Sequence, residues 1–136
     1  LDYFTGQVEL HEISGITKPK EHDMYHVLFK KSARTKLHYH TGGQLLITTK
    51  GNGSLVLYNK KNRGISRFKI SKTGTINLNV GDTVYIPAKT LHTHGSIKNN
   101  QIFSHIALNF YPKRSTKPQT VWFESDLRSA VTGKIQ

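Results

Sequence analysis

Apolar and polar residues alternate along many short stretches of this chain, and no long stretch repeats apolar residues every three or four positions. Alternation is the pattern of a half-buried β-strand, because successive side chains of a strand point to opposite faces. We therefore predict strands over residues 24–30, 34–40, 44–50, 54–59, 65–70, 75–80, 83–88, 102–110 and 120–124. The segment 125–131 is the one place where we expect a short helix.

Turn residues separate these stretches. Gly51-Asn52-Gly53 is a hairpin signal, because Asn and Gly tolerate the positive φ of tight turns. Further turns are expected at 60–64, at 72–74, and at Asn99-Asn100. About nine to eleven short strands at regular spacing favour an all-β fold, a small antiparallel β-barrel or sandwich in one unit.

Length and composition set the frame for this fold. A chain of 136 residues without linkers or repeats is expected to form a single domain over residues 1–136, with the first 20 residues and the tail from about 130 as mobile ends. The absence of cysteine excludes disulfides, thiolate zinc clusters and a catalytic thiol. No apolar run is long enough to cross a bilayer, so no membrane association is expected. We expect a cytoplasmic protein, while the start at Leu1 leaves a cleaved signal peptide open.

The chain is strongly basic, with 20 Lys and Arg against 8 Asp and Glu and a formal net charge of +12. Such a charge can attract nucleic acid or anionic membranes. The basic residues are spread along the chain, however, and no basic helix, helix-turn-helix pattern or aromatic RNA-binding strand accompanies them. The charge therefore indicates a lysine-rich surface, and nucleic acid is not expected as the main partner.

A group of polar residues with strand spacing is the best candidate for chemistry. His38, His40 and Gln44 lie at even spacing in HYHTGGQ, so they share one face of the chain. His92, in IPAKTLHTHG, can supply a fourth ligand from a separate strand. Two imidazoles on one face are typical of a divalent metal site. The alternatives are a polar barrel lining without metal and, for Gln44, an amide that only orients a histidine.

Two further histidines are candidates for a general acid and base. His94 shares a face with His92, and His105 lies between Phe103 and Ala107 on a strand whose other face is apolar. An imidazole with a pKa near 6.5 can give or take a proton at neutral pH. The alternative for both is a core histidine that bonds a backbone carbonyl. His11, His22 and His26 lack any partner pattern. Four aromatic residues are expected in the core: Tyr85, Phe103, Phe110 and Trp122.

Two longer motifs resemble those of a known family. Residues 38–51, HYHTGGQLLITTKG, follow the first cupin motif, and residues 81–92, GDTVYIPAKTLH, follow the second. The chain thus resembles a single-domain cupin, a jelly-roll β-barrel, with motif one over 32–51 and motif two over 81–95. Ser32 and Lys89 replace glycines of these motifs, and Gln44 replaces the usual acidic ligand.

The pattern around the histidines is similar to that of the manganese-dependent cupin hydroxynitrile lyases and their relatives. It combines HxH-x-x-GQ, a later HxHG and the SHIA of 104–107, and the opening YFTGQVEL also resembles that group. The resemblance runs to about residue 110 and implies two sets of site residues. The implied metal ligands are His38, His40, Gln44 and His92, and the implied catalytic residues of the pocket are His94 and His105.

The neutral Gln44 changes the expected chemistry of the metal. A glutamate would cancel one charge of a dication, whereas an amide oxygen leaves the ion a stronger Lewis acid. Mixed imidazole and oxygen ligands suit one divalent transition metal, manganese by the resemblance, or iron, nickel or zinc. The expected function is a metal-dependent lyase of the hydroxynitrile type on a small-molecule substrate. The alternatives are an oxygen-dependent oxidase or oxygenase and a non-catalytic binding cupin, and small cupins commonly form a homodimer.

Overall fold

The computed structural model describes residues 3–15, 21–97, 101–128 and 130–135. Within these residues the chain forms thirteen β-strands and no helix, which confirms the all-β prediction. The strands of the larger sheet are β1 (Phe4–Thr5), β4 (Arg34–Thr35), β5 (Leu37–His40), β7 (Gly53–Lys60), β8 (Ile70–Leu78), β10 (Leu91–Ser96), β12 (Thr120–Ser125) and β13 (Val131–Ile135). Those of the smaller sheet are β2 (Val8–Glu12), β3 (His22–Phe29), β6 (Gln44–Lys50), β9 (Thr83–Ile86) and β11 (Phe103–Phe110).

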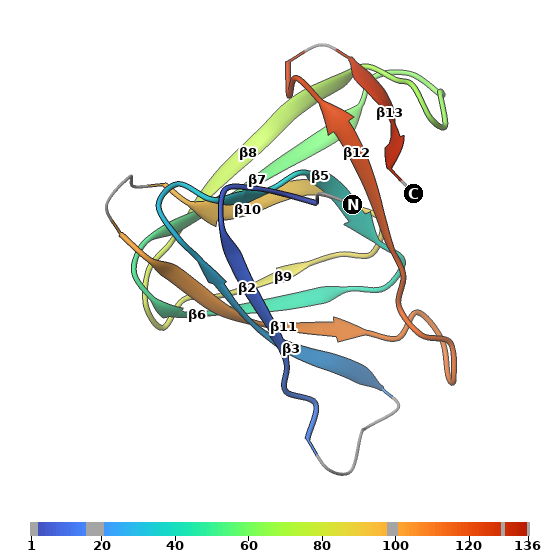
Figure 1. The fold of residues 1–136 in the computed structure, drawn as a ribbon. Coiled ribbons are helices and arrows are strands. Elements are labelled where there is room, and N and C mark those ends of the chain that lie inside the picture. The colour runs from blue at the N-terminus through green and yellow to red at the C-terminus, as the bar shows by residue number, and fades with distance from the viewer. Residues whose placement is uncertain (1–2, 16–20, 98–100, 129, 136) are drawn as a thin grey trace.

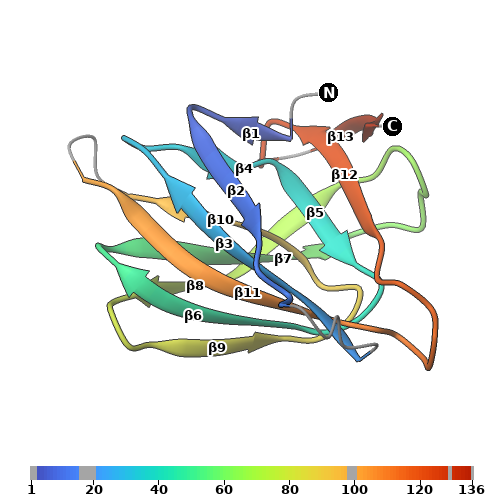
Figure 2. The ribbon, with the colours of Figure 1, turned by 60° about the horizontal axis from the view of Figure 1, so that its bottom comes forward.

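The two sheets face each other as the layers of a curled sandwich (Figures 1 and 2). The smaller sheet has the order β2-β3-β11-β6-β9. In the larger sheet β10 is central: it pairs with β7 on one side and with β4 and β5 on the other. All pairs are antiparallel, and β12 lies next to β5 with β13 beyond it. This arrangement places motif one, on β5 and β6, across both layers.

A hydrophobic core fills one end of the space between the sheets. Phe29, Leu46 and Phe103 come from the smaller sheet and Leu55 from the larger one, and each has 0 % of its surface exposed. They are the inward positions of alternating strands, as the sequence pattern requires. The other end of this space is polar and holds the histidines.

A second cluster covers the outer face of the larger sheet. Leu37, Leu91 and Phe123 are buried there with Phe68 and Ile70. The first three are sequence neighbours of His38, His92 and Trp122, so they point to the opposite side of the same strands. The central strands of the larger sheet are thus packed on both faces.

This cluster explains one wrong prediction. Residues 65–69 form no regular strand, because Phe68 packs on Phe123 while Ile65 is 82 % exposed. The strand β8 begins only at Ile70 and continues through the expected turn at 72–74. Its register against β7 shifts there, with Gly74 opposite Leu57 and Lys72 opposite Tyr58. A β-bulge, which adds one residue to a strand, removes the need for a turn.

The chain ends also differ from the predictions. The expected helix over 125–131 is wrong, because β12 extends to Ser125 and β13 begins at Val131. Near the chain ends, β1, β2 and β13 pair with neighbouring strands of the two sheets. The expected turn at Asn99-Asn100 lies outside the described residues. Among the described residues there is no helix of the length and apolar character that a membrane span needs.

Two turns carry the residues that depart from the motif glycines. Ser32 and Lys89 have φ values of 61° and 63°, the left-handed region that glycine adopts most readily. The Lys89 backbone N–H donates to the carbonyl of His40 at 2.8 Å. This bond ties the turn before β10 to the strand that carries His38 and His40.

Candidate metal centre

Three imidazoles meet where β5 lies beside β10. His38 and His92 are register partners, and their ring centroids are 4.2 Å apart. The His40 ring lies 5.0 Å from that of His38 and 5.5 Å from that of His92. One ligand atom from each residue falls within 4.8 Å of the others, a separation that one ion can bridge. The structure thus brings together three of the predicted ligands.

Each imidazole is fixed through its Nδ1 atom. His38 Nδ1 donates to the Lys36 carbonyl at 2.8 Å, and His92 Nδ1 donates to the Thr90 carbonyl at 2.7 Å. A carbonyl can only accept, so in both rings the lone pair of the neutral imidazole is on Nε2. His40 Nδ1 lies 2.9 Å from Thr120 Oγ1. Such partners orient metal-binding histidines in proteins.

Gln44, the fourth predicted ligand, is also held on one side. Its Nε2 donates to Asn109 Oδ1 at 2.8 Å, which leaves Oε1 as the free end of the amide. Within the described part of the chain, Gln44 Oε1 and the Nε2 atoms of His40 and His92 are buried and have no hydrogen-bond partner. Buried acceptors without partners are costly. A divalent cation would satisfy all three, so the donor set fits a metal.

The protonation states of the histidines suit this use. Burial lowers the pKa of His40 to about 3 and that of His92 to about 4. The neighbouring His92 lowers the pKa of His40 further, whereas the Gln44 amide raises it. Burial, followed by His92 and His40, holds the pKa of His38 well below its usual range. The three imidazoles are therefore neutral at pH 7, the form that binds metals.

The predicted acid–base pair forms a direct hydrogen bond. His105 Nε2 lies 3.1 Å from His94 Nδ1, and both rings are buried. His94 is on the larger sheet and His105 on the smaller one, so the bond joins the two layers. The His94 ring is 5.4 Å from that of His38, which places the pair beside the candidate ligands.

The pKa of both rings is depressed. Burial first, and then the neighbouring His105, hold the pKa of His94 well below its usual value. Burial lowers the pKa of His105 to about 3, with a smaller contribution from His26. Two neutral imidazoles in contact share one N–H along the hydrogen bond. The pair can therefore pass a proton between its two rings.

A cavity of about 240 Å³ joins these groups. Its lining includes four predicted site residues besides Gln44: His38, His40, His94 and His105. Leu10 also lines it and is 53 % exposed, so the cavity opens to solvent near β2. His92 is fully buried and does not itself line the cavity, but its ring packs against that of His38, which does.

Aromatic rings form one wall of this cavity. Trp122 stacks on His38 with centroids 4.3 Å apart, and Tyr3 stacks on the other side of Trp122 at 4.6 Å. The prediction of Trp122 as a core residue is therefore corrected, since it lines the cavity. Tyr85 is 57 % exposed and is not a core residue either, whereas Phe103 is fully buried as expected.

Three further polar residues of the cavity were missed by the sequence analysis. Thr120 orients His40, Asn109 orients Gln44, and Asp23 lines the cavity beyond Asn109. Asn109 and Asp23 occupy the same strand faces as His105 and Val27, so strand alternation carried a signal for both. Thr120 has no such signal, because its partner is 80 residues away in the sequence.

The other histidines lie outside this centre, as expected. His11 is exposed on β2, and His26 is its register partner on β3. His22 lies edge-on to Phe110, with ring centroids 6.1 Å apart.

Comparison with known proteins agrees with this architecture. A cupin-like protein from Thermotoga maritima has 28 % identity and a TM-score of 0.64, over 90 % of this chain and 80 % of that one. An oxalate decarboxylase from Bacillus subtilis has 15 % identity and a TM-score of 0.61, over 86 % of this chain and 28 % of that one. A DMSP lyase from Ruegeria pomeroyi has 15 % identity and a TM-score of 0.58, over 82 % of this chain and 50 % of that one.

The last two similarities concern the fold alone. Comparison with curated proteins gives no match. The protein family described as Cupin matches residues 21–134, which include both motifs and all six predicted site residues. The chain therefore belongs to the cupin family.

Proposed function

We propose that this cupin is a metal-dependent lyase of the hydroxynitrile type, which cleaves a cyanohydrin to a carbonyl compound and HCN. One observation carries the proposal. Buried atoms of His40, Gln44 and His92 have no hydrogen-bond partner, and His40 and Gln44 line a cavity that also contains a hydrogen-bonded pair of neutral histidines. This is a set of metal ligands beside a group that can move protons.

His38, His40, Gln44 and His92 would hold one divalent transition metal, with manganese as our first choice. When bound, the ion supplies a Lewis acid whose charge no ligand cancels, because all four donors are neutral. The chain contributes rigidity through the partners of these ligands: Lys36, Thr90, Thr120 and Asn109. The ligands are therefore ordered before any ion arrives.

The His94–His105 pair performs the proton transfer. It accepts the hydroxyl proton of the cyanohydrin; the electron pair of that O–H bond forms the C=O bond, and the C–CN bond breaks with its electrons on cyanide. The pair then gives the proton to cyanide, and HCN leaves. Burial lowers the pKa of both rings, which keeps them neutral at pH 7 with a lone pair available but also makes them weaker bases. General acid–base catalysis by a positioned side chain contributes about 10²–10⁴-fold.

The fold neighbours are consistent with catalytic use of this architecture, since two of them are named as a decarboxylase and a lyase. The hydroxynitrile assignment itself is supported by the motif resemblance around His38, Gln44 and His92. A homodimer remains a prediction, which size-exclusion chromatography with light scattering can test.

The test combines elemental analysis with turnover of mandelonitrile under argon. We expect the wild type to carry about one transition metal per chain and to release HCN without oxygen. His38→Ala should lose the metal, and His105→Ala should keep it while losing at least 100-fold in kcat. His11→Ala, at an exposed histidine of β2 that does not line the cavity, is the matched control.

Two results would overturn the proposal. Activity that appears only with oxygen would assign the site to oxidation. A metal-loaded wild type that turns over no cyanohydrin, yet is stabilised by small ligands, would assign it to binding.

A further inference from the structure

A row of three polar residues crosses the smaller sheet along the lining of the cavity. Asn109 is the register partner of both Gln44 on β6 and Asp23 on β3. All three line the cavity, whereas the next row, Tyr25–Ala107–Leu46, is mainly apolar. Asp23 thus lies two strands from the candidate ligand Gln44, about 10 Å between Cα atoms at normal strand spacing.

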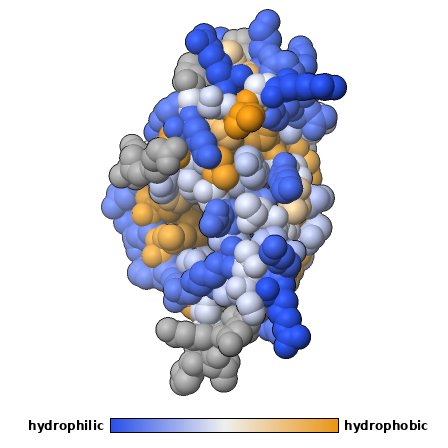
Figure 3. All heavy atoms as spheres, turned by 90° about the vertical axis from the view of Figure 1, so that its right-hand side faces the viewer, coloured by the Kyte–Doolittle hydropathy of each residue, from blue (hydrophilic) through white to orange (hydrophobic). Residues whose placement is uncertain are grey.

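Asp23 is the one carboxylate in the cavity lining, and no Lys or Arg belongs to that lining within the described residues. This contrasts with the net charge of +12 for the whole chain. On the face at the right-hand side of Figure 1, hydrophilic residues surround several apolar patches (Figure 3). The residues that line the cavity therefore carry a formal charge opposite in sign to that of the whole chain.

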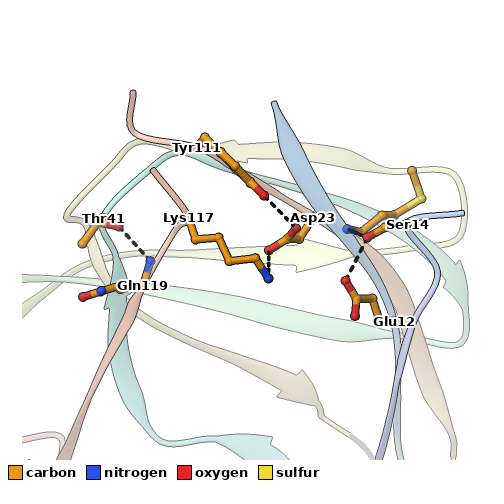
Figure 4. Close-up of polar contacts among 8 residues, drawn as sticks. Glu12, Ser14, Asp23, Thr41, Tyr111, Lys117 and Gln119 are labelled. Atoms are coloured by element: carbon orange, nitrogen blue, oxygen red, sulfur yellow. Dashed lines mark hydrogen bonds and ion pairs between the residues drawn. The ribbon is translucent and has the colours of Figure 1, made fainter. Parts of the chain in front are cut away.

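The carboxylate of Asp23 is weakly satisfied. The residue is only 7 % exposed, yet it accepts one long hydrogen bond, from the Tyr111 hydroxyl at 3.5 Å. Lys117 Nζ lies 3.9 Å from its other oxygen, and that lysine side chain is 72 % exposed (Figure 4). A buried carboxylate can accept several hydrogen bonds and is costly without them. Asp23 therefore retains capacity for a further donor.

The two ends of the cavity differ in charge. Four neutral ligands leave a bound dication uncompensated at one end, and Asp23 supplies a negative charge at the other. Between them Tyr25, Val27 and Trp122 give an apolar wall. A ligand that fits both ends has an oxygen donor for the metal and a cationic group for Asp23.

We propose that Asp23 is the specificity-determining residue of the site and that the substrate is a small bipolar molecule with an ammonium group. Binding of the substrate oxygen by the metal rests on the proposed function, whereas binding of the ammonium group by Asp23 does not. Within the lyase chemistry, the substrate is a carbonyl compound or cyanohydrin that carries a cationic amine. Lys117 is the competitor that such an amine must displace.

The experiment compares three probes of equal chain length: 4-aminobutanoate, butanoate and butylamine. Their binding to zinc-loaded protein is measured by NMR titration in the wild type, in Asp23→Asn and in Glu9→Gln. The last variant makes the same charge change at a residue that is not in the cavity lining and pairs with Lys30. We expect the wild type to prefer 4-aminobutanoate over butanoate about tenfold, the scale of a charge-assisted hydrogen bond.

Asp23→Asn should reduce this preference to less than twofold and leave butanoate binding unchanged, whereas Glu9→Gln should keep the preference. Lys117→Gln, which leaves Asp23 intact, should increase it. Equal preference in the wild type and Asp23→Asn would overturn the inference, as would a wild type that binds butanoate as well as 4-aminobutanoate.

Butylamine on the metal-free protein separates the two proposals. If the wild type binds no metal but Asp23→Asn still weakens butylamine about tenfold, the metal proposal fails and the role of Asp23 stands. If the wild type binds metal but Asp23→Asn leaves butylamine binding unchanged, the metal proposal stands and the role of Asp23 fails.

Discussion

Gln44 and Asn109 are neighbours across β6 and β11, and the amide of Gln44 donates to the amide oxygen of Asn109 at 2.8 Å. This contact decides which end of Gln44 faces the imidazoles. With Nε2 engaged, Oε1 is the end left for a cation, and the ligand set stays neutral. Asn109 therefore acts on the chemistry of the centre through the orientation of Gln44.

Replacement of Gln44 by Glu should tighten metal binding and slow the lyase reaction. A carboxylate adds a negative ligand, which raises affinity and reduces the Lewis acidity of the ion. Competition with a chelator measures the affinity, and HCN release measures the rate. The matched variant Gln44→Leu, which has no donor oxygen, should weaken metal binding at least tenfold. A Glu variant that binds metal as weakly as the Leu variant would contradict the assignment of Gln44 as a ligand.

Thr120→Val should weaken metal binding about 10- to 100-fold without unfolding the protein. Valine keeps the shape of threonine but removes the hydroxyl that lies 2.9 Å from His40 Nδ1. Chelator competition again gives the affinity, and urea unfolding of the metal-free protein gives the stability. Thr75→Val, at an exposed position of β8, is the control. An unchanged affinity in Thr120→Val would show that His40 needs no such partner.

The metal-free protein should lose stability as the pH falls from about 6.5 towards 3. The folded-state pKa of His105 is about 3, below the value near 6.5 expected in the unfolded chain. In this window the unfolded chain binds more protons, so the free energy of unfolding rises with pH and falls on acidification. The slope is at most about 1.4 kcal/mol per pH unit for each such histidine. Urea unfolding at pH 7, 6 and 5 measures it.

The variant His105→Leu removes one of these groups and should show a smaller slope over the same range. Because His38, His40, His92 and His94 are also buried with lowered pKa values, part of the slope should remain. A wild-type stability that is flat between pH 7 and 5 would contradict the neutral, buried state of these rings.

Lys89→Gly should be more stable than Lys89→Ala by about 0.5–1 kcal/mol. Both variants remove the same side chain, but only glycine adopts the φ of 63° at this position without a steric penalty. Urea unfolding of the two metal-free variants gives the difference directly. A more stable alanine variant would mean that this turn relaxes out of the left-handed region.

Strand alternation was sufficient to predict which of the site histidines share a strand face. It placed His38 with His40, His92 with His94, and His105 on the inward face of its strand. All five rings are buried, and all except that of His92 line the cavity. The same rule failed at β8, where the bulge before Gly74 interrupts the alternation that would have marked one long strand. It also could not identify Asp23 as a site residue, because Asp23 is distinguished by lying in the same cross-strand row as Asn109 and Gln44. Which residues lie opposite one another on neighbouring strands depends on the strand register, and the register is set by packing across the sheet.

The two-sided packing of the larger sheet has a consequence for how the site arises. A shift of β5 against β10 by one residue would turn Leu37 away from the outer cluster that it shares with Leu91 and would bring a polar neighbour into its place. The pairing that hides these leucines is the same pairing that sets His38 opposite His92. Formation of the three-histidine cluster is thus inseparable from acquisition of the native topology, so the proposed metal can find its ligands assembled only after these strands have paired.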